Sequence, residues 1–242
     1  MNIDKTTWRF FTPNKMINST DVYVWRVFLD WPVFQTEKIL ANLCADEVTR
    51  AERFRFQRDR NRFIVARGML REILAYYIGE MPPEIRFKYN AHGKPALTID
   101  SFCFNLSHCG PFALYAITRG REIGIDIEQV RPNVAIEEIA QRFFSSKEVN
   151  ALQMIHESKR CELFFQYWTR KEAFLKAIGA GLSFPMEKVD VSSISGRDLS
   201  PVTLLGNEEQ SLRWYAQDLF PNDDYVAAIA AEGDDWELSF IT

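Results

Sequence analysis

The feature that most constrains the fold is a similarity between two amphipathic segments that lie one hundred residues apart. RFIVARGMLREILAYYIG (62–79) and ELFFQYWTRKEAFLKAIG (162–179) align without a gap, so that Glu72 falls on Glu172 and Gly79 on Gly179. Apolar residues at helical spacing that run into a glycine predict a long helix with a glycine at its end. A chain that repeats such a segment is expected to contain two similar halves.

A second, weaker similarity supports this duplication. FALYAITRGREIGIDIE (112–128) and YVAAIAAEGDDWELSFI (225–241) both alternate apolar residues with others, reach a charged turn with glycine, and alternate again. This pattern predicts a β-hairpin in each half. We therefore expect an α+β fold with two similar α/β subdomains related by a pseudo-twofold axis, each a helix packed on a small antiparallel sheet. We place the halves at 1–121 and 122–242, with a ligand cleft between them.

Composition restricts the class of protein. The chain has 242 residues, 47% of them apolar, and a net charge of −4, which is typical of a globular protein. No apolar run approaches the ~20 residues that span a bilayer. The N-terminal MNIDKTTWRFF lacks the apolar core of a signal peptide. We expect a cytoplasmic protein that does not contact a membrane.

Histidine and cysteine usage restricts the metal chemistry. The four cysteines are irregularly spaced with no C-x-x-C, and the chain has three histidines. This pattern does not indicate zinc, and it predicts reduced thiols. Any bound metal should therefore have oxygen ligands.

Carboxylates suggest where such a metal would bind. In GIDIEQV (124–130), a strand would place Asp126 and Glu128 on one face, where they repel each other unless a cation lies between them. Glu172 and Lys176 lie one turn apart on the second predicted helix. Taken singly, each pattern has a simpler interpretation: two exposed acids on a half-solvated strand, and an ion pair on the surface of a helix. Together, three carboxylates suit Mg²⁺, and Lys176, with Lys171 as a second candidate, would face the phosphates of a substrate.

Three other segments could bind phosphate. Lys94 lies between glycine and proline in NAHGKPAL, and Ser107 and His108 precede a Gly-Pro break in NLSHCGPFAL. The stretch TRAERFRFQRDRNR (49–62) carries six arginines. Each segment alone is more often a solvated turn or face. Their occurrence beside a predicted oxygen-ligand metal site favours a phosphorylated ligand.

In this order, GKP, N-x-SHC-G, GIDIE and W-x-x-KE-x-x-x-K resemble the motifs of the 4'-phosphopantetheinyl transferases, of the larger pseudo-dimeric type that activates peptide synthetases. The similarity extends from roughly residue 45 to 184. It implies transfer of the 4'-phosphopantetheine arm of coenzyme A to a serine of an apo acyl or peptidyl carrier protein, with release of 3',5'-ADP. The carrier would belong to a fatty acid, polyketide or nonribosomal peptide pathway.

The resemblance also implies roles for individual residues. The implied Mg²⁺ ligands are Asp126, Glu128 and Glu172, and the implied catalytic residues are Glu172, Lys176 and Asp126. The implied contacts to coenzyme A are Arg50, Arg53, Lys94, Ser107, His108 and Lys176.

Among these contacts, Arg50 and Lys94 match positions at the 3'-phosphate, and Lys176 matches the lysine beside the pyrophosphate. Glu47 stands where some relatives carry a second base, with Arg53 as a substitute. Glu172 would take the proton of the carrier serine directly or through a metal-bound water. We expect a monomer.

Two other functional classes fit parts of the pattern. A metal-dependent nuclease would also combine acidic ligands, a lysine and a basic helix, although the negative net charge argues against nucleic acid as a partner. A non-catalytic binding module could use the three carboxylates to hold a structural cation. A test for transfer to a carrier serine separates the transferase from both.

Overall fold

The structure is a computed structural model, and it describes residues 16–242 except 100, 195, 197, 208–210 and 212. The N-terminal stretch 1–11, on which the localisation prediction partly depends, lies outside the described residues. Within the described part of the chain, no helix is long and apolar enough to cross a membrane.

The two predicted long helices are α3 and α6, each of 22 residues. The helices are α1 (Val33–Leu40), α2 (Ala45–Glu52), α3 (Gln57–Ile78), α4 (Ile136–Phe143), α5 (Ser146–Met154) and α6 (Glu157–Ile178), with short 3-10 helices η1 (Pro82–Glu84), η2 (Gly181–Ser183) and η3 (Met186–Lys188). The strands are β1 (Asp21–Phe28), β2 (Phe87–Tyr89), β3 (Pro95–Leu97), β4 (Phe102–Cys109), β5 (Phe112–Arg119), β6 (Ile123–Gln129), β7 (Val189–Asp190), β8 (Ser200–Pro201), β9 (Thr203–Leu204), β10 (Trp214–Asn222), β11 (Tyr225–Glu232) and β12 (Glu237–Ile241).

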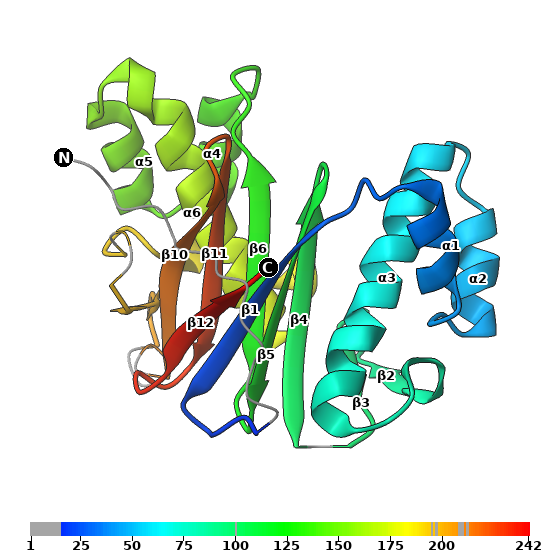
Figure 1. Ribbon diagram of the computed structural model, residues 1–242. Coiled ribbons are helices and arrows are strands. Elements are labelled where there is room, and N and C mark those ends of the chain that lie inside the picture. The colour runs from blue at the N-terminus through cyan, green and yellow to red at the C-terminus, as the bar shows by residue number, and fades with distance from the viewer. Residues whose placement is uncertain (1–15, 100, 195, 197, 208–210, 212) are drawn as a thin grey trace.

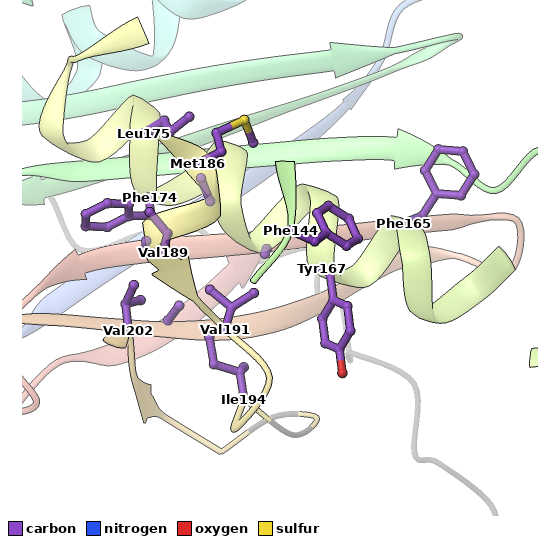
Figure 2. Packing of buried hydrophobic residues seen from close by; sticks show 14 of the residues in the cluster. Phe144, Phe165, Tyr167, Phe174, Leu175, Met186, Val189, Val191, Ile194 and Val202 are labelled. Carbon is purple, nitrogen blue, oxygen red and sulfur yellow. The ribbon is translucent and has the colours of Figure 1, made fainter. Parts of the chain in front are cut away.

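The elements form four layers, and this arrangement confirms the predicted fold of two α/β subdomains (Figure 1). One sheet has the strand order β12-β1-β5-β4 and the other β6-β11-β10-β8. Helix α3 packs on the outer face of the first sheet and α6 on the outer face of the second, and each makes its own apolar core. Figure 2 shows the core beneath α6, where Phe174, Val189 and Val202 come together. A third core lies between the inner faces of the sheets.

The hairpin prediction was wrong in both halves. Strand β6 pairs with β11 and not with β5, and β12 pairs in parallel with β1 and not with β11. The reason is that β5 lies between β1 and β4, and β11 lies between β6 and β10, so neither has an edge left for the strand that follows it. The chain therefore crosses to the other sheet after each glycine turn. The division at residue 121 stays a prediction, and β12 lies in the first sheet.

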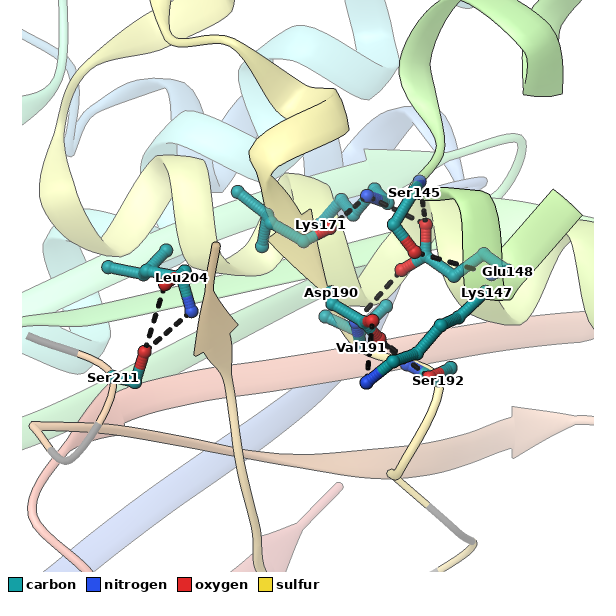
Figure 3. Close-up of polar contacts among 10 residues, drawn as sticks. Ser145, Lys147, Glu148, Lys171, Asp190, Val191, Ser192, Leu204 and Ser211 are labelled. Atoms are coloured by element: carbon teal, nitrogen blue, oxygen red, sulfur yellow. Dashed lines mark hydrogen bonds and ion pairs between the residues drawn. The ribbon is translucent and has the colours of Figure 1, made fainter. Parts of the chain in front are cut away.

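A buried ion pair anchors α6 to the second half. The Lys171 ammonium is fully buried and lies 2.8 Å from a Glu148 carboxylate oxygen (Figure 3). It also donates to the carbonyls of Met186 and Val189. Glu148 in turn accepts hydrogen bonds from the backbone N–H groups of Ser145 and Val191. Every charge is therefore partnered, as a buried pair requires.

One glycine sets the distance between α6 and the second sheet. At Gly124 in β6, a Cβ would lie 2.0 Å from the Ala173 carbonyl oxygen and 2.3 Å from the Ala177 nitrogen of α6. These contacts are too short for any side chain, so only glycine allows the helix to lie directly on the strand. This close approach brings Glu172 and Lys176 next to the acids of β6.

Candidate active site

Three elements meet at the candidate site: β4 at the edge of the first sheet, β6 at the edge of the second, and the helix α6. Alternate residues of β4 point toward β6, where Asn105 accepts a hydrogen bond from the Ile125 N–H at 3.0 Å. One pair further along, the Ser107 hydroxyl donates to Asp126 at 2.9 Å. In β6, Ile125 and Ile127 are buried between the sheets. The strand therefore presents Asp126 and Glu128 toward the opposite side, as the alternation predicted.

Lys176 connects these elements. Its ammonium lies 2.6 Å from the Asp126 carboxylate and donates to the Ser107 hydroxyl at 2.9 Å and to the Ile125 carbonyl at 3.3 Å. Asp126 is 5% exposed, so the ion pair is shielded from water on one side. Ser107, which we expected to contact phosphate, holds Lys176 and Asp126 together in this structure.

The three carboxylates influence one another. Burial raises the pKa of Glu128, and the nearby charge of Asp126 raises it further. Burial also raises the pKa of Glu172, with Asp126 and Glu128 adding to the effect and Lys176 opposing it. Burial is the main cause of both shifts, and repulsion among the carboxylates adds to it.

This charge distribution suits a hard cation. Asp126 Oδ2 is buried and has no hydrogen-bond partner, which is costly unless a ligand binds it. Asp126, Glu128 and Glu172 line the same pocket, and carboxylate oxygens are the ligands that Mg²⁺ prefers. Within the described part of the chain, however, no group of three or more His, Cys, Asp or Glu side chains is arranged to hold a metal ion. The three carboxylates supply oxygen donors of the kind that Mg²⁺ prefers, with substrate oxygens or water as the other ligands, and the assignment stays a prediction.

The carboxylate pocket has a volume of about 440 Å³ and adjoins two others. A second pocket of about 450 Å³ lies between α2, α3 and β4, and shares Leu106 and His108 with the first. A third, of about 290 Å³, lies beside the loop between β2 and β3, and shares Glu172 and Lys176 with the first. Because neighbouring pockets share lining residues, the three adjoin one another across both halves, as expected for an extended ligand.

The second pocket is lined by arginines. Arg50 lies over the ring of Phe63, 5.2 Å from its centroid, and Arg62 and Arg67 also line the pocket. His108 is at the boundary with the carboxylate pocket, where partial burial and then the charge of Lys176 lower its pKa. Arg62 and Arg67 are already paired with Asp30 and Glu47. An anion in this pocket would therefore depend mainly on Arg50, with the imidazole as a neutral neighbour.

Glu47 has a structural role that the sequence did not reveal. Its carboxylate bonds Arg71 at 2.5 Å and also pairs with Arg67, while its position at the start of α2 lets it accept from the Cys44 N–H. Burial alone would raise the pKa of Glu47, but the two arginines outweigh burial and lower it. Glu47 therefore does not leave a gap in the phosphate site, because Arg67 of α3 lines the pocket beside it.

Two predicted phosphate ligands have other surroundings. Arg53 is exposed at the end of α2 and is outside the residues that line the arginine pocket. The Lys94 ammonium bonds Glu122 at 2.6 Å and the carbonyl of Ala177 at 2.7 Å. Both assignments to the 3'-phosphate stay predictions. The prediction that Lys171 faces the phosphates was wrong, because Lys171 is fully buried and paired with Glu148.

Two lining residues were not identified from the sequence: Arg67 in the arginine pocket and Trp168 in the carboxylate pocket. Arg62, which also lines the arginine pocket, belongs to the basic stretch that was predicted to bind phosphate. Arg67 lies one turn before Arg71 on the predicted helix. Nothing in the sequence separates it from the solvated arginines nearby, because its orientation depends on Glu47 of another helix.

Comparison with known proteins agrees with this geometry. Residues 122–230 match the model of the 4'-phosphopantetheinyl transferase superfamily, and residues 32–119 match that of the 4'-phosphopantetheinyl transferase N-terminal domain. The chain is 38% identical to the 4'-phosphopantetheinyl transferase HetI of Nostoc sp. over 239 residues, which is 97% of each chain. It is 29% identical to the 4'-phosphopantetheinyl transferase Sfp of Bacillus subtilis, over 69% of this chain and 75% of that one.

Two sheets with a charged pocket between β4, β6 and α6 define a pseudo-dimeric transferase of the larger type. The chain belongs to the 4'-phosphopantetheinyl transferases. It is an enzyme that transfers the 4'-phosphopantetheine arm of coenzyme A to a serine of an apo carrier protein, as the sequence motifs implied.

Proposed function

We propose that transfer takes place in the carboxylate pocket and that coenzyme A extends from it into the arginine pocket. The observation that carries this proposal is the contact of Lys176 with both Ser107 and Asp126, beside Glu172 and next to an arginine-lined depression. Lys176 would contact the pyrophosphate. Arg50 and His108 would contact the 3'-phosphate or the groups beside it. Arg67, which was not among the predicted contacts to coenzyme A, would join them.

In this reaction the oxygen of the carrier serine attacks the phosphorus that bears the pantetheine arm. A new P–O bond forms to the serine while the bond to the other phosphate breaks, and 3',5'-ADP leaves with the electron pair. Lys176 neutralises charge that develops on the leaving phosphate, and positioning by Ser107 and Asp126 keeps the ammonium in place. Glu172 would accept the serine proton, directly or through a water molecule.

Asp126, Glu128 and Glu172 would hold Mg²⁺, which when bound supplies positive charge to the pyrophosphate. Asp126 Oδ2, which is buried without a partner, supports this assignment. Both halves of the site come from one chain, so we propose that the enzyme acts as a monomer. The four cysteines are free thiols, which agrees with the reducing cytoplasm as its location.

The direct test is incubation with coenzyme A, Mg²⁺ and a panel of apo acyl and peptidyl carrier proteins, read by intact mass. We expect each accepted carrier to gain one phosphopantetheine. Removal of divalent cations with a chelator should stop the gain, and added Mg²⁺ should restore it. The panel identifies the carrier class. A folded protein that modifies no carrier in Mg²⁺ would contradict the proposal, and cleavage of DNA or RNA in the same buffer would favour the nuclease.

A further inference from the structure

The loop between β2 and β3 is bound to the last turn of the catalytic helix α6. Asn90 donates through its side-chain amide to the Gly179 carbonyl at 2.8 Å. Lys94 donates to the Ala177 carbonyl at 2.7 Å. The Asn90 side-chain oxygen accepts from the N–H groups of His92 and Lys94, at 2.9 Å each, so the loop itself is held in one shape.

These bonds fall where a helix needs them. The last carbonyls of an α-helix have no partner within the helix, and a cation near that end is favourable because of the helix dipole. Leu175 is capped by the Gly179 N–H, which leaves the Ala177 and Gly179 carbonyls for side chains. Ala177 is also the residue that contacts Gly124 of β6 on the other side. The end of α6 is therefore fixed by the strand and by the loop.

The equivalent helix of the first half lacks this arrangement. Both helices end in a glycine with a left-handed backbone, Gly79 and Gly179. A Cβ at Gly79 would meet nothing within 4 Å, whereas one at Gly179 would lie 2.7 Å from the Asn90 amide and 3.3 Å from the Lys94 side chain. The loop thus covers the end of the helix that carries the catalytic residues and not the end of its counterpart.

We infer that Asn90 and Lys94 are positioning residues, which act on the reaction through α6 by capping its C-terminus from the other half. Lys94 has its ammonium engaged by a helix carbonyl and by Glu122, and its side chain is 15% exposed. Lys176 lies one residue before the capped Ala177, and Glu172 one turn earlier. A small shift of this turn would move both relative to Asp126, and misplacement on the scale of 1 Å can cost about a hundredfold in rate.

This inference competes with the assignment of Lys94 to the 3'-phosphate, and one set of variants separates the two. Lys94→Met removes the capping cation, and Lys94→Arg keeps a donor with the same charge. Asn90→Asp keeps the oxygen that accepts from His92 and Lys94 but removes the donor to Gly179. Arg50→Gln is the matched control for a residue that contacts phosphate.

The first measurement is binding of coenzyme A and of dephospho-coenzyme A, followed by kcat and KM with an apo carrier that the parent enzyme modifies. We expect Lys94→Met and Asn90→Asp to lower kcat at least tenfold and to change binding of both ligands by the same factor, within about twofold. Lys94→Arg should recover most of kcat. Arg50→Gln should instead weaken coenzyme A selectively. A loss in Lys94→Met of at least tenfold for coenzyme A, with none for dephospho-coenzyme A, would overturn the inference.

The second measurement is amide hydrogen exchange, which does not depend on the proposed function. In Lys94→Met and Asn90→Asp, peptides from the last two turns of α6 should exchange faster, while those from the last two turns of α3 should not change. Unchanged exchange at α6 would overturn the inference even if activity fell. Failure of the parent enzyme to modify any carrier would refute the proposed function, whereas the exchange result would still decide the capping role.

Discussion

The two long helices are held in their halves by the same device, but of the two only α6 lines the carboxylate pocket. Arg71 of α3 and Lys171 of α6 are one hundred residues apart, and each is buried and paired with a glutamate that caps a short helix. Arg71 also donates to the carbonyls of Pro82 and Ile85, as Lys171 does to Met186 and Val189. The interior of the duplicated unit is therefore preserved in both halves.

The next residue on each helix is a glutamate, and here the halves differ. Glu172 lines the carboxylate pocket, whereas Glu72 is exposed and bonds Asn42 at 3.1 Å. The strands differ as well. Strand β1 pairs with β5 as β6 pairs with β11, and in this register Asp126 and Glu128 correspond to Trp25 and Val27. The predicted alignment placed them on Ser239 and Ile241 of β12, which also lack carboxylates.

This comparison separates residues that build the unit from residues that we propose take part in the reaction. The buried basic residue, Arg71 or Lys171, and the capping glutamate that pairs with it occur in both halves. Their role is therefore to fix a helix on its sheet. The acids of β6 and Lys176 occur once, because Tyr76 stands in place of Lys176 on α3. Whether a charged residue in such a protein is structural is therefore better decided from the equivalent residue of the other half than from its position in a motif. By this criterion Lys171, although inside the W-x-x-KE motif, is structural.

The largest expected effect is on stability, from Lys171→Met. Loss of the ammonium leaves Glu148 buried without its cation, and breaking a buried ion pair typically costs about 3–5 kcal/mol. Arg71→Met should cost less, roughly 1.5–3 kcal/mol, because Glu47 keeps Arg67. The free energy of unfolding, from urea titration, measures both. Equal costs in the two halves would show that Arg67 does not support Glu47.

The next effect is on turnover. Asp126→Ala, Glu128→Ala and Glu172→Ala should each lower activity about a hundredfold to a thousandfold while the protein stays folded, since each would remove a ligand of the Mg²⁺ that supplies positive charge to the reacting phosphates. Glu72→Gln, the matched change on α3, should stay within a few-fold of the parent. The readout is kcat for carrier modification in Mg²⁺. Near-normal turnover by any two of the first three variants would contradict the metal assignment.

The same comparison predicts stoichiometry. Glu72 alone cannot replace three ligands for an ion that prefers octahedral oxygen coordination, so we expect one Mg²⁺-dependent coenzyme A site per chain. Titration calorimetry should give a single binding event per monomer. Two equivalent coenzyme A molecules per chain, or a folded but inactive Glu72→Gln enzyme, would show that the first half also contains a site.

A smaller effect is expected at the arginine pocket. Counted from the capping glutamates Glu47 and Glu148, Arg50 of α2 falls on Ala151 of α5, which cannot bind an anion in the same way. Arg50→Ala should weaken coenzyme A by roughly 1.5–3 kcal/mol, the worth of a charge-assisted hydrogen bond, and dephospho-coenzyme A much less. Binding of the two ligands by calorimetry gives the difference. Equal weakening would place Arg50 away from the 3'-phosphate.

The sequence was sufficient for what depends on local pattern. The helices α3 and α6, their glycine ends, and the shared face of Asp126 and Glu128 follow from periodicity, and each was confirmed. The pairing of β6 and β12 could not be predicted, because it depends on which sheet edges are free. Strand β1 occupies the edge of β5 as β6 occupies that of β11, and β1 lies outside the two aligned segments from which the hairpins were predicted.

The partners of the charged residues were also out of reach of the sequence. Lys171 and Lys176 are five residues apart on one helix, yet one is buried against Glu148 and the other faces the pocket. Glu47 resembled a missing phosphate ligand, although it neutralises two arginines of another helix. Such roles depend on contacts between segments far apart in the chain, and these appear only in the folded structure.

The smallest effect concerns the pH dependence of stability, which should have opposite sign in the two halves. The arginines lower the pKa of Glu47, so its contribution is present above the unfolded pKa of about 4.3 and is lost as the pH falls through the lower folded pKa. Burial raises the pKa of Glu148 despite the charge of Lys171. The contribution of Glu148 to the free energy of unfolding is therefore present below the unfolded pKa of this carboxyl group. It is lost as the pH rises through the higher folded pKa. Glu47→Gln should therefore cost more stability at pH 7 than at pH 3, and Glu148→Gln more at pH 3 than at pH 7. Urea unfolding at both values measures this, and slopes of the same sign would show that the two capping glutamates share one electrostatic environment after all.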